Sequence, residues 1–212
     1  SGERQQAIDT FNQARTVWQK AGDQSREAEM HVRVGRTYEA LNDKPKALAA
    51  YGEALTVYRA AKDQVGEANT LLDLGAVNRD AGNNSLALEF FQQALPLWRA
   101  LNRKREEAST LNFLGLTYKT LGDKQQALDN YNAALALARE VNNRAQEATI
   151  LNNIAAVYSA SGEKRRALDS YNAVLPLRRA ANDKLGEAST LTNIGGVHAE
   201  LGENQRALEL YN

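Results

Sequence analysis

The same residues return every 40 positions along the chain, and this repeat constrains the fold more than any other feature of the sequence. Three sets of residues keep the spacing. They are the dipeptide Glu-Ala beginning at positions 27, 67, 107, 147 and 187; Ala7, Ala47, Ala87, Ala127, Ala167 and Ala207; and Phe11, Tyr51, Phe91, Tyr131, Tyr171 and Tyr211. A fixed period of about 20–50 residues indicates an array of similar units that stack on one another.

One unit, residues 107–146, reads as two helices. Leu111, Leu114 and Tyr118 recur at spacings of four or fewer residues and share one helical face. Gly122 then supplies a residue that tolerates left-handed backbone, and Asp123 is a favoured N-cap. A second apolar face follows in Ala127, Leu128, Tyr131, Ala134, Leu135 and Leu137. Each unit is therefore predicted to be an antiparallel hairpin of helices of about 15–18 residues.

A single hairpin cannot bury both of its apolar faces, so neighbouring hairpins must stack. Hydrophobic residues make up 43% of the chain and only 3 prolines occur, which favours helix. The predicted fold is all-α, an α-solenoid of stacked antiparallel helix hairpins that forms a right-handed superhelix. We expect one solenoid over residues 1–212, with partial repeats at 1–26 and 187–212 and full repeats at 27–66, 67–106, 107–146 and 147–186.

The unit resembles the tetratricopeptide repeat, whose signature runs Trp-x2-Leu-Gly-x2-Tyr, then Ala-x3-Phe. The matching residues of the third unit are Leu111, Leu114, Gly115, Tyr118, Ala127, Tyr131 and Ala134. The closing proline of the family is replaced by Arg59, Arg99, Arg139 and Arg179. Without that proline the second helix is free to continue, which explains a period longer than the usual 34 residues. The long unit is similar to the subgroup found in large bacterial multidomain proteins and in kinesin light chains.

The resemblance implies a non-enzymatic scaffold that binds a protein or an extended peptide in a concave groove lined by the first helix of each repeat. The candidate peptide-binding residues are Arg33, Arg36, Arg79, Asn112, Lys119, Asn152, Asn153 and Asn193. Asparagine amides both donate and accept, so they suit a peptide backbone. They are equally compatible with a plain solvated surface. The alternative function is a regulatory arm that contacts an adjacent peptidase or signalling domain of a longer protein.

Composition argues against several other classes. Lys plus Arg and Asp plus Glu both total 26, so no net positive charge favours nucleic acid or an anionic membrane. The chain has no cysteine, and its two histidines, His31 and His198, lie four repeats apart. We therefore expect no catalytic site, no metal and no cofactor. The lack of cysteine is compatible with a reducing compartment such as the cytoplasm.

Two further expectations concern packing and the ends of the chain. Trp18, Tyr58 and Trp98 recur at one position of the second helix and are predicted to pack between repeats. The recurring glutamates are expected to pair with arginines such as Arg99 and Arg139. Both ends interrupt a repeat without a polar capping helix, which predicts end-to-end self-association.

Overall fold

The computed structural model describes residues 2–211, and every regular element in that range is an α-helix. The helices are α1 (Gly2–Ala21), α2 (Gln24–Ala40), α3 (Lys44–Ala61), α4 (Gln64–Asp80), α5 (Asn84–Ala100), α6 (Lys104–Thr120), α7 (Lys124–Glu140), α8 (Arg144–Ala160), α9 (Lys164–Ala180), α10 (Lys184–Glu200) and α11 (Asn204–Tyr211). The nine helices α2 to α10 have 17 or 18 residues each, in agreement with the predicted hairpins. None of the helices in the described part of the chain is long and apolar enough to span a membrane.

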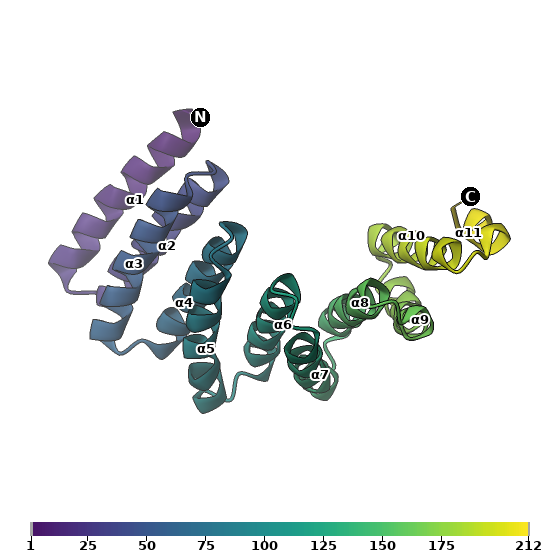
Figure 1. Ribbon diagram of the computed structural model, residues 1–212. Coiled ribbons are helices and arrows are strands. Elements are labelled where there is room, and N and C mark those ends of the chain that lie inside the picture. Colours follow the sequence, from purple (N-terminus) through teal and green to yellow (C-terminus); the bar gives the residue numbers. More distant parts are fainter. Residues whose placement is uncertain (1, 212) are drawn as a thin grey trace. The chain divides into compact units, whose positions relative to one another are not determined.

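The helices group into two compact units that divide between Arg103 and Lys104. The N-terminal unit holds α1–α5, and the C-terminal unit holds α6–α11 (Figure 1). Within each unit every helix packs antiparallel against the next, and the first helices of successive repeats, α2 with α4 and α6 with α8, also touch. The predicted all-α fold of stacked hairpins is confirmed. The assignment of residues 1–212 to one solenoid stays a prediction.

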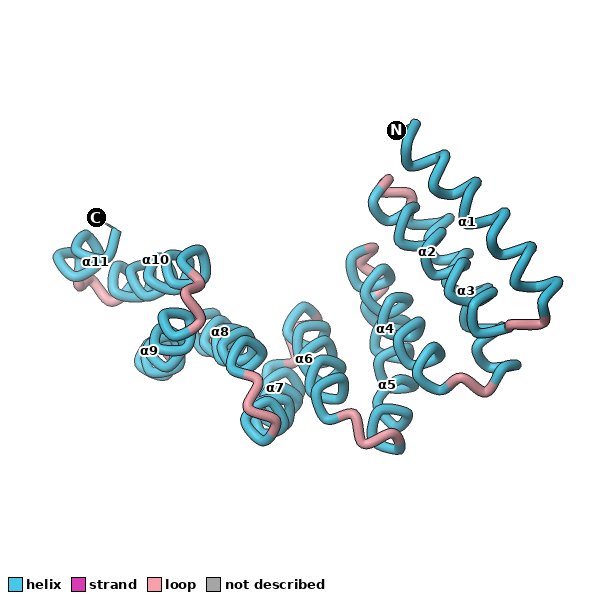
Figure 2. The backbone as a smooth tube through the Cα atoms, turned by 180° about the vertical axis from the view of Figure 1, so that it is seen from behind, coloured by secondary structure: helices cyan, strands magenta, loops and turns pink. Residues whose placement is uncertain are grey.

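Short turns join the helices at both ends of the hairpins (Figure 2). One residue of each turn has positive φ, and it is the first or second residue after the helix. These residues are Gly22, Asn42, Lys62, Gly82, Asn102, Gly122, Asn142, Gly162, Asn182 and Gly202. The side chain of the next residue caps the following helix in six turns, and its oxygen accepts a backbone N–H three residues on. These N-caps are Asp23, Asp43, Asp63, Asp123, Asn143 and Asp183. The predicted roles of Gly122 and Asp123 are therefore confirmed.

The repeated spacing of glycine and aromatic residues is explained by packing inside the hairpins. A Cβ on Gly115 would lie 2.7 Å from the Tyr131 ring, and one on Gly75 would lie 2.4 Å from the Phe91 ring. The glycine of the first helix, which has no side chain, thus leaves space for the fully buried aromatic ring of the second helix. A side chain at Gly75 or Gly115 would therefore displace the ring, whereas the fourth unit has Ala155 at this position.

Of the three recurring second-helix aromatics, Tyr58 and Trp98 are buried as predicted, whereas Trp18 is half-buried. Trp98 is 1% exposed and Tyr58 is 8% exposed, and both belong to a cluster that includes Leu71 and Leu74 of α4. His31 also lies in the interior, where burial, followed by the charge of Arg15, lowers its pKa. The described residues contain no group of three or more side chains placed to hold a metal ion.

Candidate functional site

In the N-terminal unit, the predicted cations of α2 are already paired with carboxylates. The Arg33 guanidinium donates to Glu29 Oε1 through Nε at 2.9 Å and Nη2 at 2.6 Å. Arg36 Nη2 donates to Asp73 Oδ2 at 3.1 Å and so links α2 to α4. The charged surface of this unit is therefore largely neutralised from within.

Asp73 is the more buried partner of that inter-helix pair. Burial raises its pKa, and the Arg36 guanidinium acts in the opposite direction. Next to it, the Tyr51 hydroxyl donates to the Glu39 carboxylate. The first-helix face of the N-terminal unit is thus a connected network of charged and phenolic groups.

A shallow pocket of about 300 Å³ lies on this face. Its lining is formed by Phe11, Glu29, Val32, Arg33, Arg36 and Thr37. The structure therefore brings the predicted residues Arg33 and Arg36 together. Arg79 lies apart from them near the end of α4, where its Nη2 donates to Asp80 Oδ1 at 2.9 Å.

The C-terminal unit replaces these charges with amides that bond to one another. Asn153 Nδ2 of α8 donates to Asn112 Oδ1 of α6 at 2.9 Å. One repeat later, Asn193 Nδ2 of α10 donates to Asn152 Oδ1 of α8 at 3.4 Å. The predicted asparagine ladder therefore also ties the first helices together, and each pair uses one donor and one acceptor of its amides.

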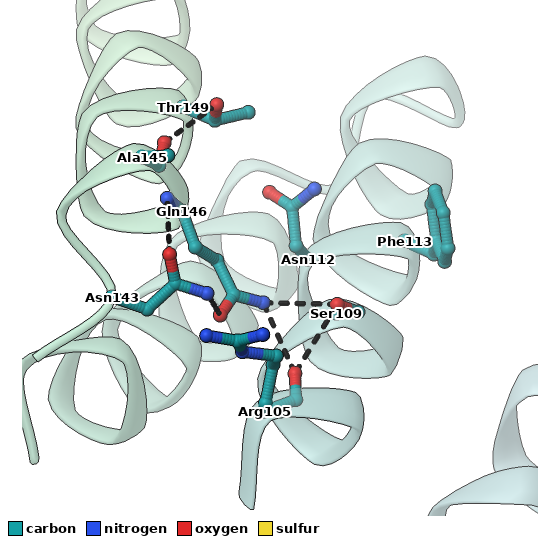
Figure 3. A pocket seen from close by; sticks show the side chains of 8 residues that line it. All are labelled: Arg105, Ser109, Asn112, Phe113, Asn143, Ala145, Gln146 and Thr149. Atoms are coloured by element: carbon teal, nitrogen blue, oxygen red, sulfur yellow. Dashed lines mark hydrogen bonds between the residues drawn. The ribbon is translucent and has the colours of Figure 1, made fainter. Parts of the chain in front are cut away.

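A pocket of about 330 Å³ opens between α6 and α8 of the same unit (Figure 3). It is lined by Arg105, Ser109, Asn112, Phe113, Asn143, Ala145, Gln146 and Thr149. Gln146 crosses it, and its Nε2 donates to Ser109 Oγ at 2.9 Å and to the Arg105 carbonyl at 3.2 Å. Of the predicted residues, only Asn112 lines this pocket.

The size of the side chain at position 138, in the preceding second helix α7, affects which side chain fits at position 146. Position 138, one helix earlier, is an alanine that is fully buried, whereas the equivalent position two repeats earlier is Tyr58. A Cβ on Gly66, which corresponds to Gln146, would lie 2.3 Å from the Tyr58 ring. A small residue at 138 therefore permits the long side chain at 146 that builds the pocket floor.

Lys119 lies away from the asparagine ladder. It lines a separate hollow of about 230 Å³ with Gly122, Lys124, Val157, Ala160 and Ser161. The Lys124 ammonium in that hollow is paired with Glu163. Lys119 and the asparagines therefore do not form one pocket.

The recurring glutamates have the structural role that the sequence suggested. Arg139 Nε donates to Glu147 Oε1 at 2.7 Å, and the same contact joins Arg59 to Glu67 at 2.8 Å. Each pair ties the end of a second helix to the start of the next first helix. Sequence reasoning missed Arg105, Ser109 and Gln146, although positions 105, 109 and 112 share one helical face and this spacing is a usable signal.

Comparison with known proteins gives one family. A sequence profile described as Tetratricopeptide repeat matches residues 1–60, 66–140, 106–180 and 146–212. A search of curated proteins finds no match to the sequence.

Solved structures with a similar fold have low sequence identity. BtubC (BKLC) from P. vanneervenii has a TM-score of 0.84 and 19% identity, over 99% of this chain and 85% of that chain. A putative kinesin light chain with TPR-like repeats from Podosopora anserina has a TM-score of 0.74 and 14% identity, over 88% and 92%. A Rap protein complexed with Competence and Sporulation Factor has a TM-score of 0.74 and 16% identity, over 96% and 67%.

Proposed function

Because the chain belongs to the tetratricopeptide repeat family, we propose that it is a non-enzymatic scaffold that binds a protein or an extended peptide on the exposed face of its first helices. The observation that carries this proposal is the polar pocket between α6 and α8, which lies beside the Asn112–Asn153 pair. The Rap protein with a similar fold was solved in complex with Competence and Sporulation Factor, which supports ligand binding as a use of this architecture.

The amides suit an extended backbone because each retains capacity for a second partner. Asn153 donates one of its two side-chain N–H groups to Asn112, and Asn193 donates one of its two to Asn152. The remaining donors and acceptors recur once per repeat along α6, α8 and α10. A ligand that lies across these helices can therefore form backbone hydrogen bonds in successive repeats.

The charged face of the N-terminal unit is proposed to add a weaker, salt-dependent contribution. Arg33 and Arg36 remain exposed by 50% and 62% of their side-chain surface although each is paired. When an ion pair with a ligand replaces an ion pair within the protein, the binding free energy changes little. These residues should therefore contribute more to the selectivity for ligands than to the affinity.

A second candidate function is a contact of α10 and α11 with another domain of a longer protein or with a second copy of the chain. Three leucines favour it, since Leu185, Leu201 and Leu208 are 86%, 41% and 58% exposed. Leu185 lies at the start of α10, Leu201 follows its end and Leu208 lies in α11, and exposed large apolar side chains can form an association surface. An asparagine variant on α8 and α10 distinguishes this surface from the first-helix pocket.

The test selects ligands from a library of random dodecapeptides and measures their affinity for variants. The double variant Asn153→Ala, Asn193→Ala should weaken binding about tenfold, since each lost amide bond to a backbone is worth ~0.5–1.5 kcal/mol. The matched control is Asn132→Ala with Asn172→Ala, which removes two exposed amides from the second helices α7 and α9. Equal affinity of both variants and the parent chain, with the helical signal intact, would remove the proposed site.

A further inference from the structure

In the C-terminal unit, positive side chains gather at the turns that join the first helix of a repeat to its second helix. Residues 119–126 and 159–166, which contain the α6–α7 and α8–α9 turns, carry five cations and two carboxylates: Lys119, Lys124, Lys164, Arg165 and Arg166 against Asp123 and Glu163. The corresponding residues of the N-terminal unit, 39–46 and 79–86, are balanced: Lys44, Lys46 and Arg79 against Glu39, Asp43 and Asp80. Of these two sets of turns, only the one in the C-terminal unit therefore has an excess of positive charge.

Two hollows connect these turns to the neighbouring repeat. The first is the hollow of about 230 Å³ that Lys119 and Lys124 line together with the end of α8. The second, of about 330 Å³, is lined by residues 162–166 and by Leu201, which follows α10. Leu121 and Leu201 are 49% and 41% exposed. We call residues 119–126, residues 159–166 and Leu201 the turn edge, a surface that combines cations, hollows and exposed leucines.

Three cations of the turn edge are already held within the unit. Glu163 is shared between Lys124 and Arg166. Lys164 pairs with Glu200 at the end of α10. Their charge is therefore largely balanced by these two carboxylates.

The other two cations, Lys119 and Arg165, have no ion pair with any residue that the structure describes, and one of them lines each hollow. Asp123 accepts a backbone N–H as the N-cap of α7. Asp129 and Asp169 lie one helical turn further along α7 and α9 and line neither hollow. Lys119 and Arg165 are therefore available to a partner.

We propose that the turn edge docks an acidic segment of a partner protein, whose carboxylates pair with Lys119 and Arg165 and whose apolar side chains cover Leu121 and Leu201. This surface lies apart from the asparagine ladder and is independent of the function proposed for it. Complementary charge steers association and selects among partners. The exposed leucines add apolar area that is removed from water in the complex.

The aromatic residues beside the turns favour protein over single-stranded nucleic acid as the occupant. Single strands are held by bases that stack on exposed aromatic rings next to cations. Tyr118 is half-buried, and Tyr158 is 9% exposed. The Arg166 guanidinium lies 4.0 Å from the centroid of the Tyr158 ring and donates to its hydroxyl at 2.6 Å. Neither ring therefore offers a free face to a base, whereas leucines suit a protein.

The experiment uses the full 212-residue chain labelled with ¹⁵N and a probe peptide, acetylated and amidated Gly-Glu-Leu-Glu-Asp-Leu-Glu-Gly. The matched control peptide has Gln and Asn in place of Glu and Asp, and a single-stranded thymidine dodecamer represents nucleic acid. The acidic peptide should shift the backbone amide signals of residues 119–124 and 161–166. The neutral peptide and the dodecamer should leave these signals in place or bind more weakly.

Variants separate the cations from charge in general. Lys119→Gln with Arg165→Gln should weaken binding of the acidic peptide about fivefold, the scale of two exposed ion pairs, and should reduce its salt dependence. Lys20→Gln with Arg144→Gln removes one lysine and one arginine that are exposed outside the turn edge, and should leave the affinity unchanged. Asn153→Ala with Asn193→Ala should also leave it unchanged, because the ladder is a separate site.

A second pair of variants tests the leucines. Leu121→Ser with Leu201→Ser should weaken the acidic peptide at both low and high salt, because apolar burial is not screened by ions. Leu185→Ser with Leu208→Ser removes two leucines that are exposed elsewhere in α10 and α11, and should have no effect.

Four results overturn the inference. They are equal shifts with the acidic and neutral peptides, shifts that lie outside the turn edge, equal losses in the two cation variants, and tighter binding of the thymidine dodecamer than of the acidic peptide. Each of them leaves the first-helix function standing, because that function is tested with the selected dodecapeptides and the asparagine variants.

Discussion

The two units carry the same hairpins and present different first-helix surfaces. In the N-terminal unit, α2 and α4 are joined by the Arg36–Asp73 ion pair. In the C-terminal unit, α6 and α8 are joined by the Asn153–Asn112 amide pair, and Asn153 stands two repeats after Asp73. The repeat therefore fixes where the first helices exchange polar contacts, and leaves open whether the contact is charged or neutral.

The interior differs between the units as well, and the difference reaches the surface. One second-helix position holds Tyr58 in the N-terminal unit and Ala138 two repeats later in the C-terminal unit. The first turn of the next first helix holds Gly66 beside the Tyr58 ring, and two repeats later it holds Gln146. The Tyr58 ring and Gly66 are thus coupled by packing, and the buried alanine at 138 leaves room for the long side chain at 146.

The largest expected effect breaks this coupling directly. Gly66→Ala places a Cβ 2.3 Å from the Tyr58 ring and should lower the free energy of unfolding by ~1–3 kcal/mol through overpacking. Gly52→Ala is the control, because no atom lies within 4 Å of its added Cβ and alanine favours the helix by ~0.5–1 kcal/mol. Urea denaturation measures both, and equal midpoints would mean that ring and glycine do not constrain each other.

The next prediction compares the polar links between first helices. Asn153→Ala removes a neutral hydrogen bond and should cost ~0.5–1.5 kcal/mol at both low and high salt. Arg36→Gln removes an ion pair whose arginine is exposed although its aspartate is partly buried, so its cost of about 1 kcal/mol should shrink as salt rises. Unfolding curves at about 50 mM and 500 mM salt test the contrast, and a salt effect that is the same for both variants would contradict it.

The two units should respond differently to acid, because the pKa of Asp73 is raised and the pKa of Asp183 is lowered. Burial raises the pKa of Asp73 in the N-terminal unit, so its ionisation opposes folding at neutral pH and this penalty disappears as the pH falls. In the C-terminal unit, the Gly186 backbone N–H, followed by Arg178, lowers the pKa of Asp183. Its stabilisation is present above the unfolded-state pKa and is lost as the pH falls through the folded-state pKa.

Carboxyl ¹³C titration should therefore place Asp73 above the ordinary aspartate range and Asp183 below it. As the pH falls from about 5 to about 3, the loss in free energy of unfolding that Asp183→Asn causes should become smaller, whereas the loss caused by Asp73→Asn should not. The reverse order of the two pKa values would contradict the burial of Asp73.

The smallest effect is expected at Arg33. Its pair with Glu29 is exposed by 50% and 47% of the two side chains and joins residues one helical turn apart. Arg33→Gln should change the free energy of unfolding by no more than ~0.5 kcal/mol. A larger loss, measured by the same urea curves, would show that the charged face of the N-terminal unit is structural.

Much of this architecture could be predicted from the sequence, because hairpin formation depends on local patterns that repeat. The Asp123 cap, the turn at Gly122 and the aromatic series that includes Tyr131 were all visible as periodic positions. The site was less predictable because it depends on which side chains meet across repeats. Neither the pairing of Asn152 with Asn193 nor the hydrogen bond from Gln146 to Ser109 can be predicted from one helix alone.

Two of the predicted residues show that limit most clearly. Arg36 was predicted as a ligand cation and is held by Asp73, a residue 37 positions away on another helix. Lys119 was predicted beside the asparagines and lines a different hollow. Position within the repeat identifies the first helix and its face, but not the partner that a neighbouring repeat supplies.

The most direct test of the central claim is hydrogen exchange of the full chain with and without a selected dodecapeptide. Binding on the first-helix face predicts added amide protection in α6, α8 and α10, centred on the turns of helix that carry Asn112 and Asn153, with α7 and α9 unchanged. Protection confined to α7 and α9, or to α11, would contradict the account, because the ligand would then lie on the second helices or at the end of the stack.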